Sequence, residues 1–332
     1  MENLFSIALG ELLKDRCSAA EVRHIEATPG ERGLWQALEE SGFANALLPE
    51  EAEGAALPLA QAFELWELCG RYALPLPLPE TQWARALLHA SGVQSVPAGP
   101  IGLGLGWRPD PCEQSHIAEV SAGRGCDHVL IGGPEGLRLL PVAQARIQPH
   151  GLALDARMGW RDSDWAATPL WPYPTDLTLA QALLAAAQLS GAMMAVFEQT
   201  LDYANQRQQF GKPIGKFQAI QHNLSLLAEE VFAARMAVQM ACEGQGARLS
   251  TQRIAVAKAR TSLAAQKVTA LAHGLHGAIG FTHEFDLQLR TRRLHAWRLC
   301  AGAESHWQQR LGADLLARHD QTLDFLRELT DH

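Results

Sequence analysis

The stretch Tyr203-Ala-Asn-Gln-Arg207-Gln-Gln-Phe210-Gly211-Lys-Pro-Ile-Gly-Lys-Phe-Gln218 joins two long helical patterns and decides how the fold is interpreted. Arg207 carries a planar fork of donors that suits a phosphate, and Phe210 offers an apolar ring three residues later. Gln218 can both donate and accept hydrogen bonds at the edge of a base. These side chains suit the pyrophosphate and the base of a nucleotide.

A corner between two helices explains the same stretch without any ligand. In that interpretation Phe210 is buried, Gly211 ends the first helix, and Pro213 opens the second. The Arg207 side chain then lies in solvent near a helix C-terminus, where a positive charge is favourable. The residues alone leave both interpretations open.

Two blocks of the sequence resemble the acyl-CoA dehydrogenase family. The first block consists of Tyr203, Arg207, Gln209-Phe210-Gly211, Ile214-Gly215 and Phe217-Gln218. The second block, His276-Gly277-Ala278-Ile279-Gly280-Phe281-Thr282, is similar to the H-G-G-I-G-F-T turn of that family. Both blocks stand in the family's order with helical patterns between them. The resemblance implies FAD as cofactor, an acyl-CoA thioester as substrate and an electron-transfer flavoprotein as electron acceptor.

The composition is that of a globular protein, with 47% hydrophobic and 19% charged residues in 332. A net charge of -8 argues against nucleic acid as a main partner. One basic cluster, Arg290, Arg292, Arg293 and Arg298, could be an anion site or a solvated helix face.

The six cysteines are scattered, without the paired spacing of a zinc site, so we expect no metal and reduced thiols in a cytoplasmic protein. The N-terminus lacks the pattern of a signal peptide. No apolar run is expected to reach the length of about 20 residues that spans a bilayer.

Periodicity predicts a mainly α fold with a small β domain. Residues 1–95 read as an N-terminal helical domain, with stops at Thr28-Pro29-Gly30 and at the proline-rich run from Leu74 to Pro79. Residues 96–176 contain the strand-length runs Ile101–Trp107, Val129–Ile131 and Leu137–Val142. Residues 177–332 repeat apolar side chains at helical spacing, which predicts a C-terminal four-helix bundle for FAD binding and oligomerisation, with small residues at its seams. Its fourth long helix is expected from about Glu284 toward Leu329.

The predicted β domain departs from the family pattern. Relatives grip the flavin ring and the thioester with a T-E-P-x-x-G-S-D loop and a W-I-T-N strand, and this sequence has neither motif. The acid-and-hydroxyl cluster Asp162-Ser163-Asp164 comes too late in the chain to be that loop. It follows Gly159-Trp160-Arg161 and is more like the turn that closes this domain in relatives. We therefore expect a reduced flavin-ring pocket in this chain.

The nucleotide-binding positions of the family are better preserved. Arg207, Gln209, Phe210 and Gln218 match positions that in relatives hold the adenosine pyrophosphate of an FAD whose flavin ring lies in the neighbouring subunit. Gly277 and Gly280 would let backbone N–H groups approach the pyrophosphate. Gly274 stands where relatives have Gln, and Ala278 stands where they have a second Gly, so one contact is lost and one is crowded.

The catalytic carboxylate of the family is missing at both of its usual positions. In most relatives the base lies twenty residues after the Phe of the glycine turn, and this position is Ala301, followed by Gly302. In others it lies twenty-two residues before the signature Tyr, and this position is Gln181, which accepts no proton at neutral pH. Glu304 is a weak candidate if the count slips by one helical turn.

These departures suggest a subunit that helps to bind FAD for α,β-dehydrogenation of an acyl-CoA by a catalytic partner. The pattern resembles the short, base-lacking subunits of heterotetrameric acyl-CoA dehydrogenases that act on steroid side-chain thioesters. A self-sufficient homodimeric or homotetrameric dehydrogenase with an atypical base is the first alternative. A flavin-free helical assembly protein is the second.

Overall fold

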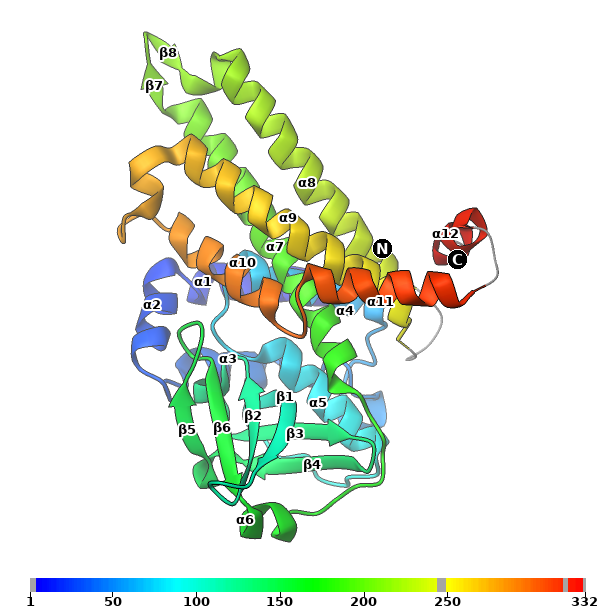
Figure 1. Cartoon of the computed structure of the whole chain (residues 1–332). Coiled ribbons are helices and arrows are strands. Elements are labelled where there is room, and N and C mark those ends of the chain that lie inside the picture. Colours follow the sequence, from blue (N-terminus) through cyan, green and yellow to red (C-terminus); the bar gives the residue numbers. More distant parts are fainter. Residues whose placement is uncertain (1–3, 244–248, 319–321, 331–332) are drawn as a thin grey trace. The chain divides into compact units, whose positions relative to one another are not determined.

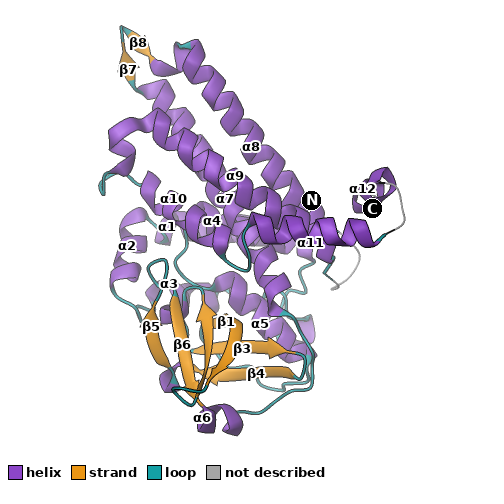
Figure 2. Cartoon of the chain, in the orientation of Figure 1, coloured by secondary structure: helices purple, strands orange, loops and turns teal. Residues whose placement is uncertain are grey.

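The computed structural model describes residues 4–243, 249–318 and 322–330, and it is mainly helical with a small sheet, as the sequence predicts (Figures 1 and 2). Contacts divide the chain into two compact units. Unit 1 comprises Met1–Leu65 and Leu74–Gln181, and unit 2 comprises Trp66–Ala73 and Ala182–His332. The division into three domains at residues 95/96 and 176/177 stays a prediction.

Unit 1 contains the N-terminal helices and the sheet. The helices are α1 (Leu4–Arg16), α2 (Ala19–Ala27), α3 (Gly33–Glu40) and α5 (Leu78–Ala90). The Ser18 side chain accepts a hydrogen bond from the backbone of Glu21 and so caps α2. Helix α2 ends directly before Thr28, and α4 (Leu59–Arg71) ends shortly before the proline-rich run, so helices stop at both predicted places.

Six strands form the sheet in the order β4-β3-β1-β2-β6-β5. Their bounds are β1 Ile101–Asp110, β2 Ser115–Val120, β3 His128–Gly133, β4 Gly136–Pro141, β5 Arg146–Pro149 and β6 Ala156–Arg161. The β1–β3 pair is parallel, and the other pairs are antiparallel. The three predicted strand runs are β1, β3 and β4.

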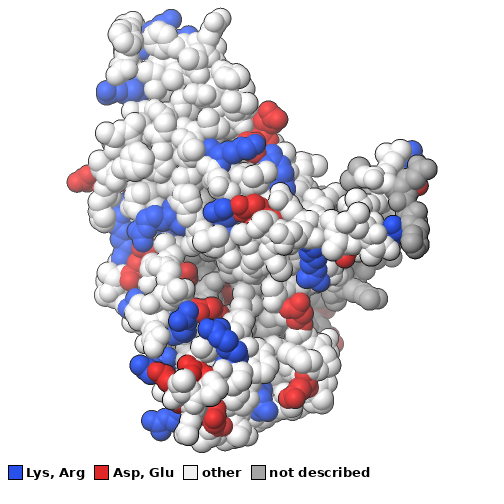
Figure 3. Space-filling view, viewed as in Figure 1, with Lys and Arg blue, Asp and Glu red and all other residues white. Residues whose placement is uncertain are grey.

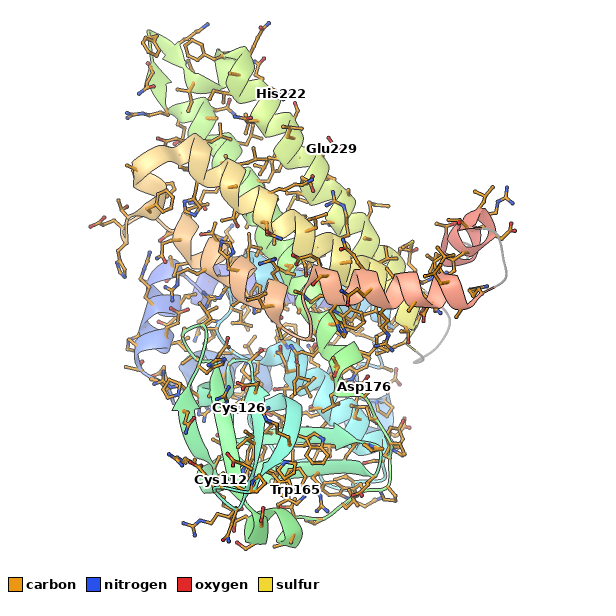
Figure 4. The ribbon with its side chains drawn as sticks, in the orientation of Figure 1. Cys112, Cys126, Trp165, Asp176, His222 and Glu229 are labelled. Carbon is orange, nitrogen blue, oxygen red and sulfur yellow. The ribbon has the colours of Figure 1, made fainter. Side chains whose placement is uncertain are left out.

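The side chain of Trp160 lies in the core of the sheet. It is fully buried, and its Nε1 donates to the carbonyl of Pro141 at 3.0 Å. Gly159–Arg161 complete β6, so the Asp162-Ser163-Asp164 cluster directly follows this strand. The short helix α6 (Asp162–Ala167) follows at once and carries Trp165 (Figure 4). The indole of Trp165 stacks on the ring of His116 with centroids 4.1 Å apart.

Unit 2 is a bundle built on three long helices, α7 (Leu177–Gln206), α8 (Gln218–Cys242) and α9 (Thr251–His276). The predicted fourth long helix is instead three shorter ones, α10 (Leu287–Leu299), α11 (Glu304–Ala317) and α12 (Thr322–Thr330). The break between α10 and α11 occurs where Ala301 and Gly302 adopt φ angles of 54° and 101°. A right-handed helix cannot continue through such angles.

Two glycines allow a close helix crossing in unit 2. Helix α4 (Leu59–Arg71) contributes its C-terminal part to this unit. A Cβ atom on Gly70 would lie 1.9 Å from the carbonyl oxygen of Gln188, and one on Gly191 would lie 1.8 Å from that of Glu67. The backbones of α4 and α7 therefore approach as only glycine allows.

Helix α7 corrects one expectation from the sequence. By length and composition it is apolar enough to cross a membrane, with a mean hydropathy of 1.5 over its most apolar window. In the structure 89% of that window is buried. The core helix of a water-soluble protein passes the same test, so the apolar character of α7 is explained by its packing.

Candidate functional site

A β-hairpin connects α7 to α8. Strands β7 (Gln208–Gln209) and β8 (Lys212–Pro213) pair antiparallel. The two turn residues, Phe210 and Gly211, have φ angles of 52° and 77°. Two successive positive φ angles are characteristic of the type I′ turns that fit the twist of a hairpin.

The ring of Phe210 projects from the tip of this hairpin. Phe210 is 90% exposed, so the corner interpretation with a buried Phe210 is wrong. Its ring meets Phe217 edge-on at 6.1 Å, and Lys212 Nζ lies 4.4 Å from the centroid of Phe217. A non-glycine residue in the left-handed region is costly, and such strain tends to occur at functional positions.

The polar residues predicted for the nucleotide are exposed as well. Arg207 follows the end of α7, where its amide donates to the carbonyl of Tyr203 at 2.8 Å. Gln209 lies in the hairpin and Gln218 begins α8, and both are exposed. The end of unit 2 that carries the hairpin shows Lys and Arg but no Asp or Glu in the view of Figure 3, which suits an anionic ligand.

The second signature block forms the short 3-10 helix η6 (Gly277–Phe281) at the end of α9. Gly277 has φ 64° and ψ -145°, a conformation restricted to glycine, and a Cβ atom there would meet nothing within 4 Å. A Cβ atom on Gly280 would lie 3.1 Å from the Cβ of His276. Gly277 therefore faces open space, whereas packing alone explains Gly280.

The structure brings the two blocks together through an aromatic stack. The rings of Tyr203 and His276 stack with centroids 4.4 Å apart, and Phe285 lies 5.1 Å from His276. His276 Nδ1 lies 2.8 Å from the carbonyl of Ala272, which fixes the proton on this nitrogen. Burial lowers the pKa of His276, so the ring is held neutral.

These residues make an open surface and not an enclosed pocket. The hairpin and η6 lie at the same end of unit 2 (Figure 1). Arg207, Phe210, Gln218 and Gly277 are all exposed in this single chain. A nucleotide placed here would be contacted from one side only.

Neither predicted base position offers a usable carboxylate. Ala301 lies in the turn between α10 and α11, and its carbonyl accepts a hydrogen bond from Trp307 Nε1 at 3.0 Å. Glu304 begins α11 and accepts two hydrogen bonds from Arg298, at 2.6 and 3.0 Å. The bonds from Arg298 lower the pKa of Glu304, so this carboxylate is a poor proton acceptor.

Gln181 lies in the interior of unit 1 and not in an open cleft. Its Nε2 donates to Oε1 of Glu80 at 3.0 Å, and both residues are buried. Burial raises the pKa of Glu80, which the hydrogen bond from Gln181 only partly offsets. Glu80 Oε2 and Gln181 Oε1 have no hydrogen-bond partner among the described residues.

The basic cluster on α10 is not a single anion site. Arg292 is exposed, Arg293 is buried against the carbonyl of Leu289, and Arg298 pairs with Glu304. Arg290 borders a cleft of about 470 Å³ beside Tyr203. Its Nε donates to the carbonyl of Arg71 at 3.0 Å, so the four guanidinium groups serve separate contacts.

All six cysteines are free thiols. Within the described ranges, no group of three or more His, Cys, Asp or Glu side chains could hold a metal ion.

The buried ionisable residues that escaped the sequence analysis include Glu80 and Lys258. Glu80 stands at the end of a proline-rich apolar run, and Lys258 lies four residues after Ile254 on the apolar side of its helix. An ionisable residue at an apolar position is the signal that could have identified both.

The comparisons with known proteins agree with this geometry. The family model for the C-terminal domain of acyl-CoA dehydrogenases matches residues 171–314. Acyl-CoA dehydrogenase IpdE2 of Mycobacterium tuberculosis is 31% identical over 80% of this chain and 81% of its own length. IpdE2 of Mycolicibacterium smegmatis is 29% identical over 92% of this chain and 98% of its own length.

Solved structures show the same fold. A steroid acyl-CoA dehydrogenase variant, Tcur3481-Tcur3483, superimposes with a TM-score of 0.76 at 23% identity, covering 94% of this chain and 96% of that chain. The ChsE4-ChsE5 complex from Mycobacterium tuberculosis gives 0.74 at 16% identity, covering 95% and 97%. The fold and the two signature blocks together are those of the flavoprotein dehydrogenases. The chain belongs to the acyl-CoA dehydrogenase family.

Proposed function

We propose that this chain is the subunit of a heteromeric acyl-CoA dehydrogenase that completes the FAD site of a catalytic partner. Arg207 and the backbone at Gly277 bind the pyrophosphate, and Phe210 and Gln218 contact the adenosine. FAD supplies the oxidising flavin that accepts a hydride from the β carbon of an acyl-CoA. The partner supplies the base that removes the α proton.

The open surface at the end of unit 2 is the observation that carries this proposal. Arg207 and the strained Phe210 are both exposed, and within the described part of the chain no second wall faces them. Small-molecule sites bury most of the surface of their ligand, so this surface is half of a site. A neighbouring subunit is the natural source of the other half.

The lack of a usable carboxylate at the base positions considered above favours a partner over self-sufficient catalysis. Ala301 has no acid, Glu304 is held by Arg298, and Gln181 is buried against Glu80. Loss of a positioned general base costs roughly 10²- to 10⁴-fold in rate. A homo-oligomer of this chain would therefore be a very slow dehydrogenase.

Similar proteins support the heteromer and suggest its substrate class. Two of the solved structures with this fold are complexes named with two components, and one of these is named as a steroid enzyme. We infer a bulky steroid-type acyl-CoA as substrate, an electron-transfer flavoprotein as acceptor and a cytoplasmic location. A flavin-free assembly protein remains the alternative in which the bundle alone is used.

An absorption spectrum of the chain, purified alone and with its co-expressed catalytic relative, tests the proposal. We expect bound flavin only in the complex. Charge-assisted hydrogen bonds contribute about 1.5 to 3 kcal/mol, so Arg207→Ala should weaken FAD binding by about 10- to 150-fold. Arg16→Ala, which removes an exposed arginine of α1, is the matched control and should leave the flavin content unchanged.

Two outcomes would contradict the proposal. Flavin on the isolated chain, together with its reduction by acyl-CoA, would establish the self-sufficient enzyme. A stable complex without flavin, or one whose flavin content is unaffected by Arg207→Ala, would assign the bundle to assembly alone.

A further inference from the structure

One face of α9 carries three polar side chains toward the turn between α10 and α11. Lys258, Ser262 and Gln266 are spaced four residues apart, so they lie along one side of the helix. Lys258 is fully buried, and the Gln266 amide donates to Glu304 Oε1 at 3.0 Å. Lys258 and Ser262 on the same face contact the end of α10 and the turn between α10 and α11.

The ammonium group of Lys258 makes three hydrogen bonds. Its Nζ donates to Ser262 Oγ at 2.9 Å, to the carbonyl of Arg298 at 2.8 Å and to the carbonyl of Gly302 at 3.0 Å. An ammonium group has three donors, and all of them are used. One side chain therefore joins the end of α10 to the turn that follows it.

These contacts satisfy groups that would otherwise be unpaired. The last carbonyls of a helix have no partner within the helix, and Arg298 lies in the last turn of α10. A positive charge at a helix C-terminus is also favourable electrostatically. Ala301, between the two bonded carbonyls, has a φ angle of 54°, a strained conformation that persists only where its surroundings impose it.

We propose that Lys258 is a positioning residue whose ammonium holds the α10–α11 turn, so that loss of one proton releases the turn. A neutral amine keeps only two donors for the three acceptors. Hydrogen bonds from an ionised donor are roughly twice as strong as neutral ones. The turn therefore has a clamped state and a loosened state, and this property depends on no ligand and on no partner subunit.

The groups around Lys258 place this transition in an accessible pH range. Burial lowers the pKa of Lys258 to about 8, while Cys300 in the turn and Glu304 on α11 oppose this shift. Arg298 on α10 adds to the lowering. His306 on α11 packs edge-on against Trp307 and is a further titratable group near the turn.

The indole of Trp307 reports directly on the turn, because its Nε1 donates to the carbonyl of Ala301. We would label the full chain with 5-fluorotryptophan and follow the Trp307 fluorine signal from pH 6.5 to 9.5. The signal is assigned by its absence in Trp307→Phe. His306→Asn is introduced into the background, so that the histidine contributes no titration.

The expected result is a change of the Trp307 signal with a midpoint near pH 8. Lys258→Met should give the high-pH signal throughout, and Lys267→Met, an exposed lysine on the same helix, should titrate as the parent does. Ser262→Ala removes one acceptor and should lower the midpoint. A parent signal that is flat across this range, or a midpoint unmoved by Ser262→Ala, would overturn the proposal even if Lys258→Met failed to fold.

Discussion

Replacing Glu80 by Gln should stabilise unit 1 at neutral pH. Burial holds the pKa of Glu80 above its ordinary value of 4.5, so the native state prefers the protonated acid. In the unfolded chain the carboxyl ionises freely as the pH rises through that value. Its contribution to stability is therefore complete below pH 4.5, and it is lost as the pH rises toward the native pKa.

The size of the gain in the free energy of unfolding depends on how far burial raises the pKa of Glu80. Each unit by which the native pKa exceeds the unfolded pKa costs about 1.4 kcal/mol at pH values above both. The amide introduced by Glu80→Gln carries a donor, as the protonated carboxyl of Glu80 does, so the hydrogen bonding open to Gln181 Oε1 is alike in both and only the cost of ionisation separates them. We expect Glu80→Gln to raise the free energy of unfolding by about 1 to 3 kcal/mol at pH 7.5.

Urea unfolding followed by circular dichroism at pH 4.5, 6 and 7.5 measures this difference. The gain should be near zero at pH 4.5 and grow by at most about 1.4 kcal/mol per pH unit. Glu39→Gln is the matched control of opposite sign. Burial raises the pKa of Glu39, but hydrogen bonds from Arg85 and Trp35 outweigh it and the pKa is lowered, so this variant should lose stability at pH 7.5.

A gain that is the same at all three pH values would refute the reasoning, because it would show that ionisation of Glu80 plays no part. A variant less stable than the parent at pH 7.5 would refute it more directly. In that case the hydrogen bond from Gln181 would outweigh the cost of burying the charge.

Gly191→Ala should destabilise unit 2 by several kcal/mol and lower its melting temperature, because its Cβ would lie 1.8 Å from the carbonyl oxygen of Glu67; a melting temperature equal to that of the parent would disprove the close crossing. Arg85→Met should cost about 3 to 5 kcal/mol in urea unfolding, because it leaves Glu39 without its buried partner; the double variant with Glu39→Gln should recover part of this loss. Ser18→Ala should cost about 1 kcal/mol through the lost cap of α2, and a change within error would show that the cap contributes nothing.

The parts of the fold that depend on local patterns could be predicted from sequence. Strand-length apolar runs identified β1, β3 and β4, and helical spacing identified α7, α8 and α9. The signature block also placed the junction of α7 and α8 correctly. These features depend on side-chain periodicity and on turn residues, which neighbours along the chain determine.

The parts that depend on distant residues were beyond such patterns. At the tip of the hairpin Phe210 adopts a left-handed conformation, which glycine favours and phenylalanine does not. The sequence therefore did not predict that the ring of Phe210 is exposed. Gly302 signals the break after α10, but the positive φ of Ala301 has no sequence signal. The Glu80–Gln181 pair joins residues 101 positions apart, and only the fold brings them together.

The path of the chain through α4 has a consequence for fragments and for biosynthesis. The segment Trp66–Ala73 belongs to unit 2, although about a hundred residues of unit 1 separate it from Ala182. A fragment that begins at Ala182 would lack one side of the glycine crossing and expose the surface of α7 that α4 covers. During synthesis, the segment Trp66–Ala73 is made long before the rest of the bundle that it completes. For the same reason, the two units cannot be exchanged between relatives as independent blocks.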